Sequence, residues 1–341
     1  MHEQRKSDHI RINLEEDVNF RQLTTGLENY HFLHQALPEI DLAQIDTSVS
    51  FLGKTLQAPL LISSMTGGTE QAHRINLTLA EAAEKCGIAM GLGSQRAALE
   101  NGDLAPSFQV RSVAPTAMLL ANLGAVQLNY GYSVDHCRRA VEMIEADALI
   151  LHFNALQEAV QPEGNTNFSG LLSKVETVCR ALEIPVIAKE VGWGFAEDTV
   201  RRLAQAGVAA IDVAGSGGTS WTQVEMYRAK SEVRRRVAAT FVDWGIPTSE
   251  AILAAKRAGN GLPIIASGGL RNGLDMAKCI ALGASVAGMA GPFLKAAVNS
   301  LQAVLDEIEI ATTELRIAMF GIGVDSIAGL QETERLIKRV D

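Results

Sequence analysis

The sequence contains only four cysteines, and none of them has a spacing typical of a metal site. Cys86, Cys137, Cys179 and Cys279 are widely separated, with no C-x-x-C pair and no histidine at a zinc-type interval nearby. This pattern gives no support to a structural zinc site or a dithiol redox motif. We expect four reduced thiols, mostly packed within or close to helices.

Long apolar runs and an excess of positive charge are also missing. No apolar run reaches the roughly 20 residues that a membrane helix needs. Residues 1–9 are charged and lack an apolar core, so we expect no secretory signal. The net charge of −9 argues against a general nucleic-acid or membrane-surface binder. We therefore expect a cytoplasmic protein in which local basic groups hold any anionic ligand.

A repeating pattern is present from residue 59 onward: a short apolar run, a polar or glycine-rich turn and an amphipathic helix, eight times over. Continuous apolar runs are typical of parallel strands with helices on one side and a packed interior on the other. Eight such units over about 250 residues predict an α/β fold, the (β/α)8 TIM barrel. A doubly wound open sheet is the alternative, because the pattern does not show whether the sheet closes. The runs are residues 59–65, 89–93, 118–124, 148–154, 185–191, 209–215, 263–269 and 285–291.

We expect a single domain in which the barrel, residues 59–315, has an extension at each end. Residues 1–58 form an N-terminal arm with capping strands, including a two-stranded piece from residue 45 to Leu56. Residues 316–341 form a C-terminal helical segment, with a terminal helix near 325–340.

The connection at residues 216–245 is long, charged and expected to be partly helical. Long connections of this kind are usually lids or binding loops. Its three consecutive arginines at 234–236 are expected to form a solvated face.

The fourth apolar run leads into four polar residues, His152, Asn154, Gln157 and Glu158. In a barrel of parallel strands the carboxyl ends form the mouth, where the chemistry takes place. An ordinary polar loop is the alternative for this segment taken alone. Because Mg²⁺ binds one or two carboxylates and completes its shell with water and substrate phosphates, Glu158 is the best metal candidate. A surface glutamate is the commoner outcome for this residue type.

Glycine-rich loops follow the seventh and eighth runs, at residues 267–271 and 288–291. These two loops are the usual phosphate site of such barrels, where backbone amides and a helix N-terminus bind the anion. Two glycine helix caps are the alternative. The turns at 64–69 and 212–221 also suit close approach of the backbone to a flat ligand or a phosphate, although any tight turn can have this composition.

Lys189 ends the fifth run and is expected to face the mouth, where it cannot easily be left unpaired. Three roles fit it: a Schiff-base nucleophile, a cation beside an electron-accepting ring, or one half of an ion pair with Glu190. The sequence does not separate these roles.

Arg5, Lys6 and His9 lie in the N-terminal arm, for which a mobile charged tail is the default expectation. If the arm folds over the mouth instead, these residues supply the positive charge that an acidic protein needs to bind an anionic substrate.

These motifs together resemble those of the type 2, FMN-dependent isopentenyl-diphosphate isomerases. The resemblance runs nearly end to end, and the ordered set is specific although no single motif is. The motifs are Arg5-Lys6-x-x-His9-Ile10, Met65-Thr66-Gly67-Gly68, Gly93-Ser94-Gln95-Arg96, His152-x-Asn154-x-x-Gln157-Glu158, Lys189-Glu190-Val191-Gly192, Gly217-Gly218-Thr219-Ser220-Trp221, Asp243-Trp244-Gly245-Ile246-Pro247-Thr248 and Ser267-Gly268-Gly269-Leu270-Arg271.

The resemblance implies a barrel that holds FMN at its mouth beside the substrate. The implied contacts of FMN are Ser64, Met65, Thr66, Ser94, Asn122, Lys189, Thr219, Gly268, Gly269, Leu270, Arg271, Ala290 and Gly291. The implied substrate-binding residues are Arg5, Lys6, His9, Ser94, Gln95, Arg96, His152, Asn154 and Gln157. Glu158 is the implied Mg²⁺ ligand, and Gln157, His152 and Glu158 are the implied catalytic residues.

The reaction that the resemblance implies converts isopentenyl diphosphate to dimethylallyl diphosphate without net redox change. One carbon gains a proton and another loses one, and because an alkene is a poor base this needs a strong, well-placed acid. In the family, reduced FMN is thought to be the acid-base group, with Mg²⁺ on the diphosphate and NADPH or NADH as the reductant of the flavin. A homo-oligomer, a tetramer or octamer, is also implied.

Other functions fit the sequence less well. An FMN-dependent 2-hydroxy-acid oxidase needs a histidine base near the last strands, and no histidine follows His152. A nucleotide dehydrogenase of the inosine-monophosphate type needs a cysteine after the sixth strand, and residues 216–221 contain none. A Schiff-base aldolase using Lys189 leaves Gln157 and Glu158 without a role. A flavin-binding barrel without catalysis is the alternative outside enzymes.

Overall fold

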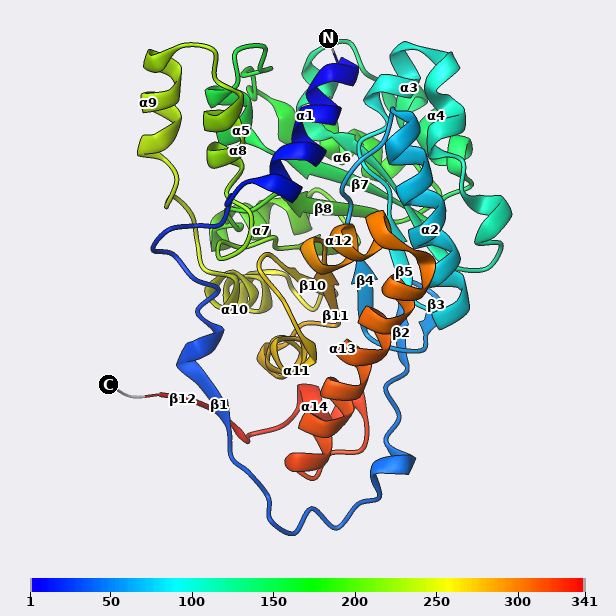
Figure 1. The fold of residues 1–341 in the computed structure, drawn as a ribbon, viewed down its shortest axis with the longest axis vertical. Helices are drawn as coiled ribbons and strands as arrows, with labels where there is room; N and C mark the ends of the chain where they lie inside the picture. The colour runs from blue at the N-terminus through cyan, green and yellow to red at the C-terminus, as the bar shows by residue number, and fades with distance from the viewer. Residues whose placement is uncertain (1, 340–341) are drawn as a thin grey trace.

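Eight parallel strands form a barrel at the centre of the molecule, closed between its last and first strands (Figure 1). The computed structural model describes residues 2–339, and within the first helix it describes side chains only for Lys6 and from Asp8 onward. Pairing of Ala287 with Leu60 closes the sheet. The predicted (β/α)8 barrel is therefore confirmed, and the open-sheet alternative is wrong.

Each of the eight predicted apolar runs contains one strand of the barrel. In order around it the strands are β4 (Leu60–Ile62), β5 (Ala89–Gly91), β6 (Met118–Gly124), β7 (Ala148–Phe153), β8 (Val186–Glu190), β9 (Ala210–Asp212), β10 (Ile264–Ser267) and β11 (Val286–Met289).

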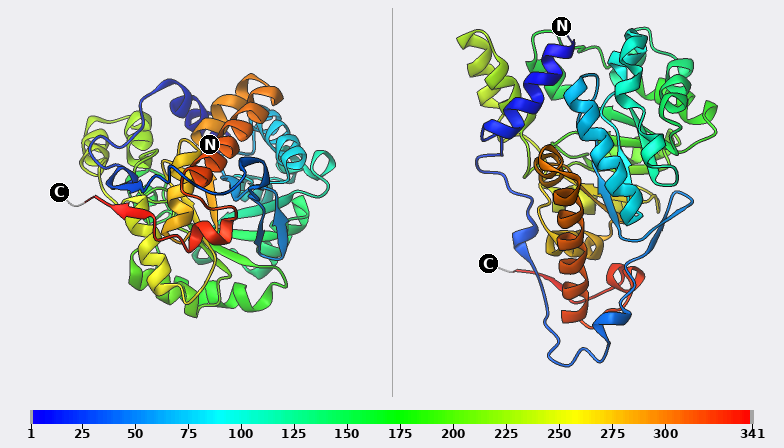
Figure 2. Two further views of the ribbon diagram at one scale, coloured as in Figure 1. Left: turned by 90° about the horizontal axis from the view of Figure 1, so that it is seen from below. Right: turned by 45° about the vertical axis from the view of Figure 1, so that its right-hand side comes forward.

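Helices follow the strands and surround the barrel (Figure 2). They are α2 (Glu70–Cys86), α3 (Arg96–Glu100), α4 (Val134–Ile144), α5 (Ala155–Val160), α6 (Leu171–Ala181), α7 (Glu197–Gln205), α8 (Trp221–Arg228), α9 (Glu232–Thr240), α10 (Thr248–Ala258), α11 (Gly273–Leu282), α12 (Gly291–Asn299) and α13 (Leu301–Gly321). Short 3-10 helices are η1 (Leu27–Asn29), η2 (Leu42–Gln44), η3 (Gly102–Phe108), η4 (Arg111–Val113) and η5 (Ala125–Asn129). Among the described residues, no helix combines the length and apolar character needed to cross a membrane.

Helix α2 shows how local sequence signals set the limits of these elements. The Thr69 side chain accepts a hydrogen bond from the Ala72 amide at the N-terminus. Ile75 and Leu79 lie one turn apart and are buried against the barrel. At the C-terminus Gly87 adopts a left-handed conformation with φ 61°, which costs glycine little. The helix therefore begins and ends where its capping residues stand.

The barrel interior forms an apolar core of its own, distinct from the shell between strands and helices. Leu61, Ile150 and Ile265 are among the fully buried side chains inside it. Phe51 and Leu56 pack onto this interior core from the hairpin of β2 (Val49–Phe51) and β3 (Lys54–Leu56). The expected two-stranded piece is thus confirmed, and it closes the end of the barrel opposite the mouth.

The N-terminal arm runs the length of the barrel, from helix α1 (His2–Glu15) beside α5 and α8 down to the capping hairpin (Figure 1). Several hydrogen bonds anchor it to the connection after β9. The Phe20 amide donates to the Gly218 carbonyl at 3.2 Å, and the Arg21 amide donates to the Asp243 carboxylate at 2.8 Å. The arm is therefore a docked segment rather than the mobile tail that was the default expectation.

The C-terminal end differs from the expected terminal helix near residues 325–340. Helix α14 (Ile327–Gln331) is short, and strand β12 (Leu336–Lys338) follows it and pairs antiparallel with β1 (Tyr30–Phe32). Pairing with β1 supplies the backbone hydrogen bonds of this segment. The helical prediction is right for Ile327–Gln331 and wrong for residues 332–339, while residues 340 and 341 lie outside the described part of the chain.

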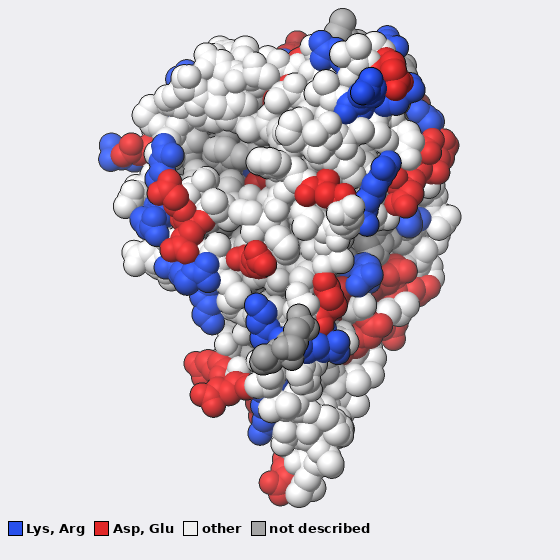
Figure 3. Space-filling view, turned by 90° about the vertical axis from the view of Figure 1, so that its left-hand side faces the viewer, with Lys and Arg blue, Asp and Glu red and all other residues white. Residues whose placement is uncertain are grey.

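Charged side chains of both signs are interspersed on the face shown in Figure 3. The arginines at 234–236 in α9 are exposed, as expected for a solvated face.

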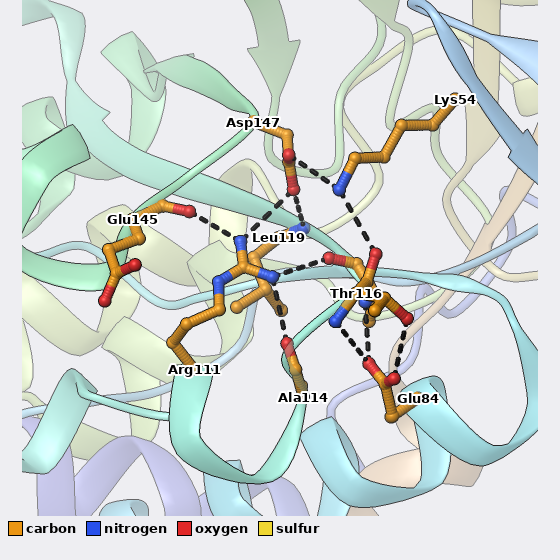
Figure 4. Close-up of polar contacts among 9 residues, drawn as sticks. Lys54, Glu84, Arg111, Ala114, Thr116, Leu119, Glu145 and Asp147 are labelled. Carbon is orange, nitrogen blue, oxygen red and sulfur yellow. Dashed lines mark hydrogen bonds and ion pairs between the residues drawn. The ribbon is translucent and has the colours of Figure 1, made fainter.

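A charged network holds the capping hairpin to the amino end of the strands (Figure 4). The Asp147 carboxylate lies 2.7 Å from Lys54 Nζ and 3.2 Å from Arg111 Nη2, and it accepts the Leu119 amide at 2.9 Å. Nearby, the Glu84 carboxylate accepts the amide and hydroxyl of Thr116. One carboxylate thus joins the hairpin, the η4 segment and the start of β6.

We predict that Asp147→Asn lowers the free energy of unfolding by roughly 1–3 kcal/mol, because Lys54 and Arg111 lose their shared counter-ion. Urea unfolding measures the change. Asp135→Asn is the matched control, since Asp135 pairs with Arg138 on an exposed helix face and should change stability by less than about 0.5 kcal/mol. Equal effects of the two substitutions would contradict an anchoring role for Asp147.

Candidate active site

A cavity of about 700 Å³ lies at the carboxyl ends of the strands, within the size range of small-molecule sites. Almost all residues that the sequence analysis proposed for the site line it. They are Lys6, His9, Ser64, Met65, Thr66, Ser94, Arg96, Asn122, His152, Asn154, Gln157, Glu158, Lys189, Thr219, Gly268, Gly269, Leu270, Arg271, Ala290 and Gly291. Arg5 lies in α1, but its side chain is outside the described residues.

Gln95 is an exception, because its side chain is fully buried behind the cavity wall. Its Nε2 donates to the Ala140 carbonyl at 2.7 Å, and its Oε1 accepts the Asn122 amide at 3.0 Å. Gln95 therefore holds the backbone of Asn122 in place. Its side chain does not line the cavity, where a contact with the substrate was expected.

His152 stands on β7 with its ring fixed by a neighbouring strand. Its Nδ1 lies 2.8 Å from Asn122 Oδ1 on β6. Since an amide oxygen only accepts, this contact places the proton of a neutral ring on Nδ1. Gly124 on β6 pairs with His152, and an added Cβ there would lie 3.2 Å from His152 Nε2. The glycine thus leaves the ring room at the mouth.

Asn154, Gln157 and Glu158 form a buried polar cluster at the start of α5. Asn154 Nδ2 donates to Glu158 Oε1 at 2.9 Å and to Gln157 Oε1 at 3.1 Å. The Asn165 amide donates to the other Glu158 oxygen. Asn154 Oδ1 is buried without a hydrogen-bond partner. The cluster therefore offers carboxylate and amide oxygens, the ligand type that Mg²⁺ prefers.

Glu225 on α8 is a site residue that the sequence analysis missed. It is buried, and its Oε1 lies 3.3 Å from His9 Nε2 and accepts Gln157 Nε2 at 3.2 Å. Its other oxygen contacts Arg228. Glu225 thereby joins the arm to the polar cluster on α5. The available signal was its position one helical turn after Trp221 of the Gly-Gly-Thr-Ser-Trp motif.

The pKa shifts of the His9–Glu225 pair follow from its burial. Burial lowers the pKa of His9 and outweighs the nearby Glu225 carboxylate. Burial alone would raise the pKa of Glu225, but the hydrogen bond with His9 and the Arg228 guanidinium leave it lowered. Burial thus disfavours the protonated form of His9, and the pair joins the arm to α8. Among the described side chains, Lys6 of the arm and Arg96 of α3 line the cavity and carry positive charge.

Lys189 is paired with Asp212 on the adjacent strand, at 3.2 Å. Its Nζ also donates to the backbone carbonyl of Glu190. The Glu190 carboxylate instead accepts three amides, from Val191, Gly192 and Trp193. Burial raises the pKa of Glu190 to about 7 despite these amides. An ion pair between Lys189 and the Glu190 side chain, one of the three expected roles, is therefore wrong.

The loops after β9 and β10 pack backbone to backbone beside the start of α12. Gly268 and Gly269 have φ of 104° and 79°, which few other residues adopt. An added Cβ on either would overlap the backbone of Gly215 or Gly217. At Gly291, where α12 begins, an added Cβ would meet open space. A glycine-rich rim next to a helix N-terminus suits a phosphate.

Next to this rim, where β4 pairs with β11, small hydroxyl residues with unmet hydrogen-bonding capacity form a hydroxyl wall. The side-chain oxygens of Ser63, Ser64 and Thr66 are buried without a partner. Buried polar atoms are normally satisfied, so these three oxygens fit a polar ligand in the cavity.

Sequence comparison places this site in a known family. A family model described as FMN-dependent dehydrogenase matches residues 2–106 and 136–338. Isopentenyl-diphosphate delta-isomerase of Nostoc sp. is 54% identical over 332 residues, which cover 97% of this chain and 95% of the relative. The enzyme of the same name from Rickettsia peacockii is 50% identical over 331 residues, covering 97% and 96%. The chain belongs to the isopentenyl-diphosphate delta-isomerases.

Solved structures agree with this family in fold. A lactate oxidase from Pediococcus acidilactici superposes with a TM-score of 0.69 at 16% identity, covering 99% of this chain and 93% of the other. A mandelate oxidase complex with (S)-2-phenylpropionate gives 0.67 at 21% identity, covering 99% and 97%. At these identities the likeness shows a common barrel, and the isomerase family rests on the closer relatives.

The cavity fits the cofactor of an FMN-dependent family. The unpartnered hydroxyls of Ser64 and Thr66 offer polar contacts to a ring. The glycine-rich rim at Gly268, Gly269 and Gly291 lines the same cavity and offers a phosphate cradle. Both features belong to one cavity, so a flavin mononucleotide has partners for its ring and for its tail.

Gly67 follows the hydroxyl wall in the chain, and a substitution there would show how far this wall can move. An added Cβ there would overlap the fully buried ring of Phe108. We predict that Gly67→Ala displaces the Ser64–Thr66 turn, costs about 1–3 kcal/mol of stability and weakens FMN binding. Thermal unfolding and a flavin fluorescence titration measure the two effects. Gly102→Ala, where an added Cβ meets open space, is the control. Wild-type flavin affinity in Gly67→Ala would show that the wall tolerates displacement.

Proposed function

We propose that the protein isomerises isopentenyl diphosphate to dimethylallyl diphosphate, with FMN as resident cofactor, Mg²⁺ on the diphosphate, and NADPH or NADH reducing the flavin without net consumption. The observation that carries this proposal is that one cavity contains both a set of residues suited to a metal and a set suited to a flavin. The buried cluster of Asn154, Gln157 and Glu158 shares it with the hydroxyl wall and glycine-rich rim. A diphosphate–metal site and a flavin site would therefore be neighbours.

Glu158 would hold the Mg²⁺, with the amide oxygen of Asn154 in the same cluster. A single carboxylate suffices, because Mg²⁺ keeps several waters and binds substrate phosphates. Lys6 and Arg96 line the cavity and would neutralise the remaining charge of the diphosphate. Local positive charge is necessary here, since the protein carries a net charge of −9.

FMN, when bound and reduced, would supply an acid-base group next to the alkene. The residues of the chain position the substrate and exclude water. Helix α1 lies over the mouth, where His9 packs edge-on against Trp221 with ring centroids 5.1 Å apart. Gln157 is oriented by Glu225, and His152 is oriented by Asn122. Such orientation lowers the barrier by holding the reacting atoms in one geometry.

The oxidase chemistry of the structural neighbours is less well supported. Among the described side chains, the histidines that line the cavity are His9 on the arm and His152 on β7. The last three strands cannot supply a histidine base, because the sequence has none after His152. This favours proton transfer over oxidation of a hydroxy acid.

Residues 1–58 would act as the substrate-covering arm and cap of a single domain, with the barrel at 59–315 and the C-terminal segment at 316–341. We further propose a cytoplasmic homo-oligomer, a tetramer or an octamer. Size-exclusion chromatography with light scattering tests the assembly.

A direct test is to reconstitute the protein with FMN, reduce it anaerobically, and add isopentenyl diphosphate and Mg²⁺. We predict that the alkene signals of dimethylallyl diphosphate appear in the NMR spectrum, because a proton shift needs no electron acceptor. NADPH consumption should remain far below one hydride per product. One hydride consumed for each product molecule would refute isomerisation.

We predict that Glu158→Gln lowers turnover by roughly 100-fold or more, since loss of even an outer-shell metal partner costs roughly 10- to 100-fold. The neutral amide is a poor ligand for a hard cation, whereas flavin absorbance should be unchanged. Steady-state rates against Mg²⁺ concentration measure the effect. Glu142→Gln, on the exposed face of α4, is the control. Full activity of Glu158→Gln in the presence of a chelator would remove Glu158 as metal ligand.

A further inference from the structure

Asp212 is a fully buried carboxylate beneath the cavity that no step described above uses. It ends β9, and its register partner on β8 is Lys189. Its Oδ2 lies 3.2 Å from Lys189 Nζ, and its Oδ1 accepts the Ser267 hydroxyl at 2.5 Å. Three adjacent strands thus contribute one charged triad.

The triad is held by regular backbone rather than by loops. Asp212 pairs with Ile265 on β10, two residues before Ser267. Gly288 on β11 pairs with Ser267, and an added Cβ at Gly288 would lie 2.9 Å from Ser267 Cβ. Because Gly288 has no side chain, Ser267 has room to lie beside Asp212. Groups on strands are more precisely placed than groups on loops.

Only part of the triad reaches the cavity. Lys189 and Ser267 line it, whereas Asp212 lies behind them with no exposed surface. Any influence of Asp212 on a bound molecule must therefore pass through these two residues or through the field of its charge. In a buried site this field is strong, because little solvent screens it.

We propose that Asp212 is a positioning residue for Lys189: with Ser267 it holds the ammonium at one point of the cavity wall and offsets its charge, and so sets how strongly the site favours reduced over oxidised FMN. This inference rests on the proposed binding of FMN. Reduced flavin is richer in electrons than oxidised flavin, so a cation beside it favours the reduced form. Asp212 moderates that preference.

The sign of the effect follows from the pairing. In Asp212→Asn the carboxylate charge is gone, and the ammonium of Lys189 acts on the cofactor without an offset. The midpoint potential of bound FMN should then rise. In Lys189→Met the cation is lost, and the potential should fall. If Asp212 acts through Lys189, adding Asp212→Asn to Lys189→Met should move the potential much less than Asp212→Asn does alone.

The experiment is an anaerobic reductive titration of the FMN-loaded protein against a reference dye, for the wild type, both single variants and the double variant. We expect Asp212→Asn to favour reduced FMN by about tenfold, which a two-electron couple registers as about 30 mV upward. Asp147→Asn is the matched control, since it removes a paired carboxylate at the opposite end of the barrel. It should lower stability and leave the potential unchanged.

An unchanged potential in Asp212→Asn, or an equal shift in Asp147→Asn, would overturn the proposal and leave Asp212 a structural residue only. If Asp212→Asn does not fold, Ser267→Ala takes its place. It keeps the carboxylate but removes its hydroxyl donor, so the potential should shift downward, and no shift would overturn the proposal.

The experiments distinguish a failure of the proposed isomerisation from a failure of the proposed role of Asp212. If dimethylallyl diphosphate forms but the potentials of the variants agree with the wild type, only the role of Asp212 is wrong. If FMN binds and the potentials shift as expected without product formation, the proposed isomerisation is wrong and the role of Asp212 stands. A protein that binds no FMN would refute both.

Discussion

Closure of the sheet between β11 and β4 is the constraint on which the site depends. It brings Ser64, just after the first strand, and Ala290, just after the last, to the same cavity. Because all eight strands are parallel, every residue that follows a strand is delivered to one end. An open sheet would place these two residues at opposite edges, and the hydroxyl wall and glycine-rich rim could not hold one molecule between them.

Charged side chains at the two ends of the barrel have different surroundings. At the amino end the charges of Asp147, Lys54 and Arg111 are joined in a network that fixes the capping hairpin. At the carboxyl end the carboxylates of Glu158 and Glu225 accept hydrogen bonds from amides and lie beside the cavity. Ion pairs are present at this end too, between Lys189 and Asp212 and between Glu225 and Arg228, but here they lie against the cavity.

The barrel was predictable from the sequence because continuous apolar runs and glycine-rich turns are local signals. Most cavity residues were predictable because they follow strands or match the family motifs. Glu225 was not, since its burial depends on packing of α8 against an arm more than 200 residues earlier in the chain. Gln95 looked like a ligand group but satisfies backbone atoms of two neighbouring elements. The partner of Lys189 and the strand β12 also depend on cross-strand pairing, which local sequence does not encode.

The arm has a consequence for the order of events during synthesis. Its backbone at Phe20 and Arg21 is bound to Gly218 and Asp243, contacts that span about two thirds of the chain. A polypeptide that leaves the ribosome from its N-terminus must therefore keep this segment undocked until the connection after β9 has emerged. The segment that covers the mouth is made first, but it can dock only after more than half of the chain has been synthesised.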